Sequence, residues 1–226
     1  MVVSLLTKAI GCRAKNCARK PARWQPRWCI ADPILSATGV TRRPVSLSLG
    51  YQHTCALLDN GTVKCWGYNN YGQVGDGTQA SRLAPVAVSS LVGVQALAAG
   101  SQHACAVLAD HTAKCWGINL GGQLGDTTTT SRTTPVAVSL LTGAVSLAAG
   151  AYHTCALLSD GKLKCWGTNG SGQLGNTTTT SYSSPIQIGA LTNWKSVAAG
   201  RNHTAAVKTD GTLWTWGYNG SGQLGN

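Results

Sequence analysis

The 226-residue sequence contains no phenylalanine and one methionine, so tryptophan is the main large aromatic residue available to a core. No apolar run approaches the roughly 18 to 20 residues that cross a bilayer, which favours a soluble or loosely attached protein. Sustained 3.6-residue apolar spacing is also missing, and this argues against a helical repeat. A Gly-x-Ser-x-Gly motif is absent as well, so the serine nucleophile of α/β-hydrolases is not indicated.

What the sequence does contain is a fifty-residue unit that occurs four times without an insertion. The stretch HTCALLDNGTVKCWG, which starts at His53, reappears in similar form from His103, His153 and His203. A period of this length indicates a propeller or a helical array. Each unit holds four short strand-like segments, of which the last, PVAVS in the first two units, begins with a proline that suits an edge strand. Four short strands make one propeller blade.

The pattern GxxHTxAL, DG, KCWGxN and GQLG resembles the repeat of the regulator-of-chromosome-condensation family over Val45 to Asn226. The resemblance implies a β-propeller of seven blades in a closed ring. We therefore expect an all-β chain of about four four-stranded blades within residues 33–226, preceded by an irregular, disordered leader over residues 1–32. The expected blades are 45–94, 95–144, 145–194 and an incomplete 195–226.

Four units are too few for the ring that the resemblance implies. The chain is a fragment, closes as a small four-bladed ring, or completes itself by association, and we favour a truncated gene. The segment Pro33–Ser36 resembles the last strand of a blade. It is a candidate fourth strand for the incomplete last blade.

Two cysteines ten residues apart flank a tight turn in the first three units. In Asp59-Asn60-Gly61 the glycine suits a three-residue hairpin loop, which sets Cys55 directly opposite Cys65. A two-residue Asn-Gly loop would instead place Cys55 opposite Trp66. Residues opposed at a non-hydrogen-bonded position lie close enough for a disulfide.

The fourth unit replaces both cysteines together, by Ala205 and Thr215, while His203 remains. This joint loss favours a disulfide over buried free thiols and over a His-Cys-Cys metal site. Three disulfides indicate an oxidising compartment, so we expect an extracellular or cell-envelope protein. The predicted pairs are Cys55–Cys65, Cys105–Cys115 and Cys155–Cys165.

The positive charge gathers at the start of the chain. Residues 1–44 hold nine basic residues and one acid, which is +8 of the formal +11, so nucleic-acid binding by the repeats is not supported. Trp24 and Trp28 lie among arginines and could form a nucleic-acid or membrane-surface arm, against the alternative of a disordered leader. No clear signal peptide is visible. Three further cysteines lack convincing zinc spacing: Cys12, Cys17 and Cys29.

Nothing in the repeats indicates an enzyme, a cofactor or a metal. The four repeated histidines are expected to hydrogen-bond the backbone at a strand entry, and Asp76 and Asp126 to cap their own loops. The remaining class is binding, through loop residues that vary around a fixed frame, with neutral drift as the alternative. The candidate contact residues are Tyr68, Asn70, Tyr71, Ile118, Leu120, Thr168 and Tyr218.

We therefore expect a non-catalytic propeller module of an exported protein that binds a protein or cell-surface ligand. The family resemblance also implies two alternatives. One is guanine-nucleotide exchange on a small GTPase together with chromatin binding, although the insertion that this role uses is missing. The other is a secreted enzyme-inhibiting propeller. Apart from the resemblance, the tryptophans and tyrosines at the loop tips leave a glycan-binding propeller as a further alternative.

Overall fold

All elements of the described chain are β-strands, as the sequence predicts. The structure, a computed structural model, describes residues 34–35 and 41–226, which fall into two units divided after Arg43. In the first unit β1 (Ile34–Leu35) pairs with β2 (Thr41–Arg42). The calls on the 1–32 leader and on Cys12, Cys17 and Cys29 lie outside the described residues. No helix able to span a membrane is found in the described part.

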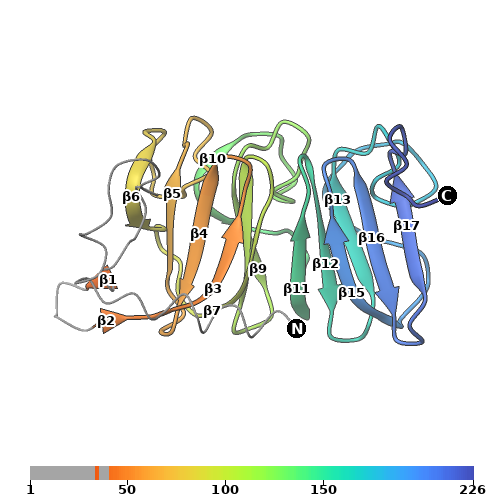
Figure 1. Cartoon of the computed structure of the whole chain (residues 1–226), viewed down its shortest axis with the longest axis horizontal. Helices are drawn as coiled ribbons and strands as arrows, with labels where there is room; N and C mark the ends of the chain where they lie inside the picture. Colours follow the sequence, from red (N-terminus) through yellow and green to blue (C-terminus); the bar gives the residue numbers. More distant parts are fainter. Residues whose placement is uncertain (1–33, 36–40) are drawn as a thin grey trace, which may run out of the picture. The chain divides into compact units, whose positions relative to one another are not determined.

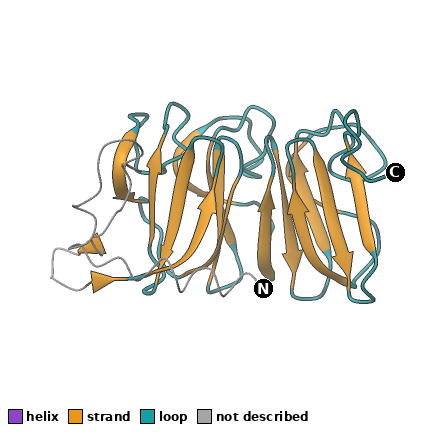
Figure 2. Ribbon diagram, in the orientation of Figure 1, coloured by secondary structure: helices purple, strands orange, loops and turns teal. Residues whose placement is uncertain are grey.

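The second unit, residues 44–226, holds four antiparallel sheets that follow one another along the chain (Figure 1). Each of the first three has four strands in sequence order and is one propeller blade; the fourth has three strands. Figure 2 shows that teal loops and turns connect the strands.

Blade 1 contains β3 (Pro44–Leu49), β4 (His53–Leu58), β5 (Val63–Gly67) and β6 (Arg82–Ala87). Blade 2 contains β7 (Val94–Ala99), β8 (His103–Leu108), β9 (Ala113–Gly117) and β10 (Arg132–Ala137). Blade 3 contains β11 (Ala144–Ala149), β12 (His153–Leu158), β13 (Leu163–Gly167) and β14 (Tyr182–Gln187). Blade 4 contains β15 (Trp194–Ala199), β16 (His203–Lys208) and β17 (Leu213–Gly217).

The central hairpin of each blade has the predicted register. Cys55 pairs with Cys65, and Leu57 pairs with Val63. Gly61 closes the turn with a φ of 73°, a left-handed conformation that glycine adopts without steric cost. His111 takes the same place in blade 2 with a φ of 62°. The three-residue turn therefore directs both cysteines to one face of the sheet.

Two predictions about the outer strands need correction. Strand β6 begins at Arg82, earlier than its proline, and a register shift between Cys65 and Gly67 accommodates Pro85 in this edge strand. The segment at Pro33–Ser36 is not the fourth strand of the last blade, because Ile34 and Leu35 pair with Arg42 and Thr41. The sheet of β15, β16 and β17 keeps three strands.

The apolar core lies between successive blades. Between blades 1 and 2 it contains Cys55, Cys65 and Val74 from one blade and Ala106 and Trp116 from the next. The same positions fill the spaces between blades 2 and 3 and between blades 3 and 4. Close packing requires a glycine against each of the tryptophans between blades, Trp116, Trp166 and Trp216. A Cβ on Gly75, for example, would lie 2.8 Å from the Trp116 ring. Each blade is therefore stabilised mainly by its neighbours.

The four blades form an open arc, which excludes the small closed ring, one of the three alternatives that the sequence left open. In the described residues, β3 packs against β7, β7 against β11 and β11 against β15, but β15 has no comparable packing against β3. Leu47 on β3 is 58% exposed and Leu213 on β17 is 66% exposed. Apolar side chains thus remain uncovered at both ends of the arc.

Candidate functional site

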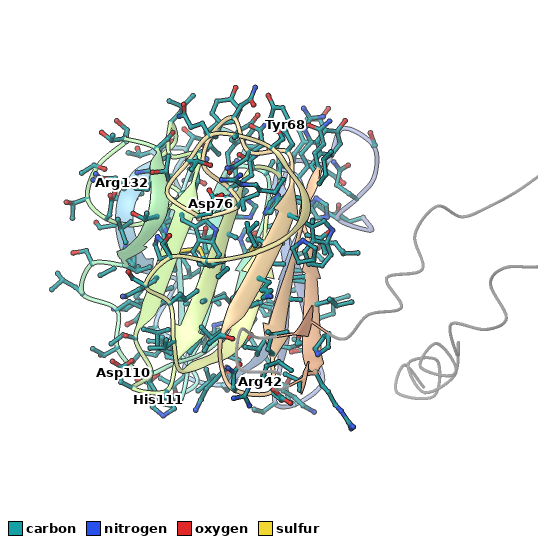
Figure 3. The ribbon with its side chains drawn as sticks, turned by 90° about the vertical axis from the view of Figure 1, so that its left-hand side faces the viewer. Arg42, Tyr68, Asp76, Asp110, His111 and Arg132 are labelled. Atoms are coloured by element: carbon teal, nitrogen blue, oxygen red, sulfur yellow. A yellow bond between two sulfur atoms is a disulfide. The ribbon has the colours of Figure 1, made fainter. Side chains whose placement is uncertain are left out.

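Five of the six tyrosines of the chain lie in the turns and loops at one end of the blades, where the sixth, Tyr182, begins β14. Here the turn from the first to the second strand of each blade lies against the loop that follows the third strand, because Tyr68 N–H donates to the Gln52 carbonyl and Ile118 N–H to the Gln102 carbonyl. We call this surface the tyrosine end. Its tyrosines are Tyr51, Tyr68, Tyr71, Tyr152 and Tyr218. Figure 3 shows Tyr68 at this end and the Asp110 and His111 turn at the opposite end.

The predicted contact residues all lie in loops of the tyrosine end, but they differ in exposure. Asn70, Leu120 and Tyr218 are exposed, whereas Tyr68, Tyr71 and Thr168 are half-buried. Ile118 is 3% exposed and packs inside, so its assignment as a contact residue is wrong.

Sequence reasoning missed the residues of the neighbouring turns. Tyr51 is 77% exposed, Tyr152 is 37% exposed, and Arg201 is exposed. A signal for them was available, because the residue after each repeated glycine changes from blade to blade while the glycine does not. These positions are Tyr51, Ser101, Ala151 and Arg201.

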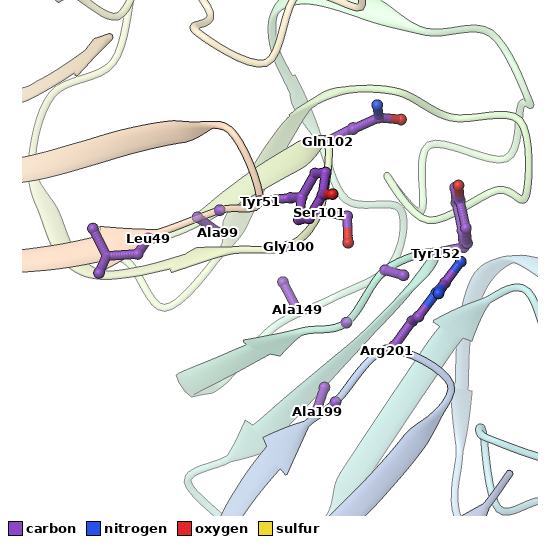
Figure 4. Close-up of a pocket in the computed structure, with 14 residues that line it drawn as sticks. Leu49, Tyr51, Ala99, Gly100, Ser101, Gln102, Ala149, Tyr152, Ala199 and Arg201 are labelled. Carbon is purple, nitrogen blue, oxygen red and sulfur yellow. The ribbon is translucent and has the colours of Figure 1, made fainter. Parts of the chain in front are cut away.

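The four turns surround a hollow of about 530 Å³ at the centre of the arc. Figure 4 shows Tyr51, Ser101, Tyr152 and Arg201 as sticks among the residues that line it. Backbone makes much of its wall, because a Cβ on Gly100 would lie 2.3 Å from the Gly150 carbonyl oxygen. The repeated glycines therefore let the blades approach one another at this point.

In blades 1 to 3 a buried asparagine holds the loop after the third strand in shape. Asn119 Nδ2 donates to the Asp126 carboxylate at 3.0 Å and to the carbonyls of Thr128 and Thr130, and its Oδ1 accepts from Leu124 N–H at 2.9 Å. Gln123 Oε1 accepts from Gly121 N–H at 2.9 Å. These contacts explain why the Asn and the Gly-Gln stay fixed while the residues between them vary.

Asp76 and Asp126 cap their loops, as predicted. Asp126 accepts hydrogen bonds from the backbone and hydroxyl of Thr128 and forms an ion pair with Arg132 at 2.9 Å. Burial acts to raise the pKa of each carboxyl, but the hydrogen bonds and the nearby arginine outweigh it and the pKa is lowered. In blade 3 both ion-pair positions change together, to Asn176 and Tyr182.

Two of the repeated histidines, His103 and His153, bond to a threonine of the next blade rather than to the backbone, which corrects the prediction for these two. His103 Nε2 lies 3.0 Å from the Thr154 hydroxyl, and that hydroxyl donates to the Gln123 carbonyl at 2.8 Å. Because the hydroxyl proton is committed to the carbonyl, His103 Nε2 is the donor. Burial and the neighbouring His53 and His153 lower the pKa of His103 to about 3, so its ring is neutral. No cluster of three candidate metal ligands occurs in the described part.

The cross-strand cysteines lie inside the blade interfaces. In blade 2 the two Sγ atoms are 2.11 Å apart and the Cα atoms 4.0 Å apart. The equivalent pairs in blades 1 and 3 have the same arrangement, and all six cysteines are at most 1% exposed. The sulfurs therefore form part of the apolar face that each blade presents to the next.

The family model of the RCC1-like domain matches residues 11–226. The chain belongs to the RCC1-like domain family. Among curated proteins, the E3 ubiquitin-protein ligase MYCBP2 of Danio rerio is 41% identical over 51 residues, which cover 23% of this chain and 1% of that protein. The probable E3 ubiquitin-protein ligase HERC4 of Homo sapiens is 41% identical over 51 residues, or 22% of this chain and 5% of that protein.

Solved structures of other proteins share the fold. Prp20p of Saccharomyces cerevisiae matches with a TM-score of 0.73 and 26% identity over 82% of this chain and 48% of that chain. Human WBSCR16 matches with a TM-score of 0.70 and 22% identity over 78% of this chain and 48% of that chain. The chain thus spans less than half of these structures and a small part of the curated relatives.

In this RCC1-like chain the tyrosine end offers phenol rings, amides and the exposed guanidinium of Arg201. The carboxylates of its loops, Asp76 and Asp126, are already engaged by arginines. Aromatic and guanidinium groups on a rigid frame suit the recognition of another molecule.

Proposed function

We propose that the chain is the binding module of an exported protein and recognises a protein or cell-surface partner through the tyrosine end. The observation that carries this proposal is the gathering of variable, exposed side chains around one hollow, on loops that buried Asn and Gln residues hold fixed. Tyrosine and arginine supply much of the energy of protein interfaces, because they bury a large area for a small loss of conformational freedom.

Export is supported by the cysteines. Three cross-strand pairs lie opposed and buried, and the blade that lacks one cysteine lacks both. A disulfide in every complete blade is typical of an oxidising compartment. Intact-mass measurement after alkylation in denaturant, with and without reductant, tests this step. Without reductant, six cysteines should escape alkylation. Alkylation of every cysteine without reductant would contradict export.

A photo-cross-linking amino acid tests recognition at the tyrosine end. The cross-linking amino acid replaces Tyr152 in the full chain, which is then incubated with the native cells or with their secreted fraction. Irradiation should yield one discrete adduct. The additional substitution Arg201→Ala should abolish this adduct. The matched control carries the same cross-linker at His111, in an exposed turn at the opposite end. Equal adducts from both positions, or none from Tyr152, would refute the proposal.

A second candidate is nucleotide exchange on a small GTPase. It is favoured by the similarity to Prp20p, whose structure was described with its binding to Gsp1p and histones. The measurement is the release of labelled GDP from a small GTPase in the presence of the chain. Accelerated release would support this candidate, and an unchanged rate would exclude it for the GTPase tested.

A further inference from the structure

The tripeptide Asn-x-Ser/Thr, in which x is not proline, accepts N-linked glycans in exported proteins. We call it the glycosylation motif. A glycan attaches to the Nδ2 atom of the asparagine, so the modified chain folds only where this atom has no hydrogen bond to keep and reaches solvent. The motif occurs five times in the chain, at Asn60, Asn169, Asn176, Asn202 and Asn219.

Asn60 meets both conditions. It lies in the hairpin turn between β4 and β5 of blade 1 and is exposed. Its Oδ1 accepts hydrogen bonds from the Thr62 hydroxyl at 2.7 Å and from the Thr62 N–H at 3.2 Å. Among the described residues, its Nδ2 donates to no partner. The side-chain oxygen therefore fixes the asparagine, while the nitrogen that would carry the glycan stays free.

This turn stays exposed with a blade on either side of it. Asp110 and Asp160 take the place of Asn60 in blades 2 and 3, each of which packs between two other blades, and both aspartates are exposed. Toward blade 2, the Val94 N–H donates to the Gly61 carbonyl at 2.9 Å. The neighbouring blade thus holds the turn without covering Asn60.

The two motifs of the blade 3 loop are built into its hydrogen bonds. Asn169 is fully buried, and its Nδ2 donates to the Asn176 side chain and to the carbonyls of Thr178 and Thr180. A glycan on Asn169 would displace these bonds. Asn176 is half-buried, and its Oδ1 accepts from Asn169 at 2.9 Å. Both side chains therefore belong to the frame of the loop.

The two motifs of blade 4 are also engaged. Asn202 is half-buried, and the threonine of its motif, Thr204, is fully buried with its hydroxyl donating to the Gln173 carbonyl at 2.7 Å. Asn219 Nδ2 donates to the Asn226 side chain at 3.0 Å. Of the five motifs, the one at Asn60 alone combines an exposed asparagine with an uncommitted Nδ2.

We propose that Asn60 carries an N-linked glycan in the exported chain. The donor is a lipid-linked oligosaccharide pyrophosphate, which a transferase of the export pathway supplies. Nδ2 of Asn60 bonds to the anomeric carbon of the sugar, the bond from that carbon to the pyrophosphate oxygen breaks, and the lipid pyrophosphate leaves. The Nδ2 proton passes to a base of the transferase. This inference rests on the export proposed above, because the chain meets such a donor only on the export route.

A glycan at this place is compatible with binding at the tyrosine end. The turn of Asn60 is equivalent to the turn of Asp110 and His111, which Figure 3 shows at the end opposite Tyr68. The other three blades carry aspartate in this turn, so only blade 1 would bear the glycan. The tyrosine end therefore stays accessible to its partner.

Peptide mapping of the full chain from the secreted fraction of the native cells tests the proposal. A glycosidase that releases N-linked glycans converts the acceptor asparagine to aspartate, and in heavy-oxygen water the new carboxyl is labelled. We expect the label at residue 60 and none at Asn169. Unchanged asparagine at position 60 would overturn the proposal. Unlabelled aspartate there would also overturn it, because an Asn-Gly pair can deamidate without a glycan.

Two substitutions make the test specific. Asn60→Asp copies the residue of the other three blades, so the variant should fold and lose the label at residue 60 completely. Asp210→Asn gives the blade 4 turn the same Asn-Gly-Thr, and Thr212 already donates to the Asp210 Oδ1 from its hydroxyl at 2.7 Å and its N–H at 2.9 Å. In the double variant the label should move to residue 210. A double variant that is folded by circular dichroism and carries no label would overturn the role of the turn.

The alkylation measurement separates this proposal from the one on export. Six protected cysteines together with an unmodified Asn60 would refute the glycan and leave export standing. Alkylation of every cysteine together with an unmodified Asn60 would refute both. Protected cysteines and a labelled residue 60 are the result that both proposals expect.

Discussion

At the residue scale, a single alanine leaves one of the repeated histidines without a partner. Thr154 and Thr204 bond the histidines of blades 2 and 3, but blade 2 carries Ala104 at this place. Both ring nitrogens of His53 are buried without a hydrogen-bond partner in the described residues. Buried polar atoms without a partner destabilise a fold, so His53 is a weak point of the first interface.

We predict that Ala104→Thr stabilises the protein by about 1 kcal/mol, because the hydroxyl can accept from His53 and donate to the Gln73 carbonyl. The urea midpoint of unfolding should rise. Ala104→Val is the control, since it has a similar shape without the hydroxyl, and it should not reproduce the gain. An equal gain from valine would attribute the effect to packing.

The sequence predicted that the repeated histidines bond the backbone, but His103 and His153 bond a threonine side chain instead. This difference shows the limit of prediction at the residue scale. The sequence places a histidine next to a threonine in three blades, but single-blade reasoning cannot show that the bonded threonine lies fifty-one residues later. Ile118 shows the same limit, because it is buried while the residues at the same place in the other blades, Tyr68, Thr168 and Tyr218, are not. Contacts within one loop, such as the Asp126 cap, were predictable because both partners are local.

At the element scale, the hairpin is the feature that the sequence predicted best. Glycine at the third turn position sets the register, and the register sets the cysteines opposite each other. The outer strands were predicted less well, since a bulge lets β6 extend beyond its proline and a short apolar segment can pair with whatever lies nearby. Local turn chemistry is therefore a better guide here than strand composition.

Blade 4 provides a natural template for removing a disulfide. The double substitution Cys105→Ala and Cys115→Thr copies Ala205 and Thr215, so the sheet should form. We predict a loss of about 2 to 4 kcal/mol in the free energy of unfolding, through the greater freedom of the unfolded chain. Urea unfolding without reductant measures the loss. The difference should shrink when the unmodified protein is unfolded with reductant, and equal midpoints without reductant would indicate that the pair is not bonded.

At the scale of the whole molecule, the period of fifty residues predicted the propeller because it depends on no single contact. The repeat also indicated how many blades to expect, and the structure has four. The curvature of the arc was not predictable. It results from the close approach of glycine backbones and the tryptophan packing between blades, which no isolated unit encodes.

The histidines form one row through the interfaces and make the stability of the whole arc depend on pH. Burial lowers the pKa of His53 and His153 from 6.5 to about 4 and, with the neighbouring histidines, that of His103 to about 3. The unfolded chain binds these protons below pH 6.5 while the folded chain does not. The stabilisation from the neutral rings is therefore complete above pH 6.5 and is lost as the pH falls toward 4. The capping carboxylates lose their contribution only as the pH falls through and below their usual pKa of 3.8.

We predict that the free energy of unfolding falls between pH 6 and 4.5 with a slope that approaches about 4 kcal/mol per pH unit, the value for three protons. Urea unfolding at a series of pH values measures this slope. His53→Gln removes a histidine that makes no hydrogen bond in the described residues, so the variant should fold and its slope should be about two thirds as steep. Because only histidines titrate in this window when carboxylates stay ionised, a free energy of unfolding that is constant from pH 7 to 5 would contradict neutral histidines between the blades.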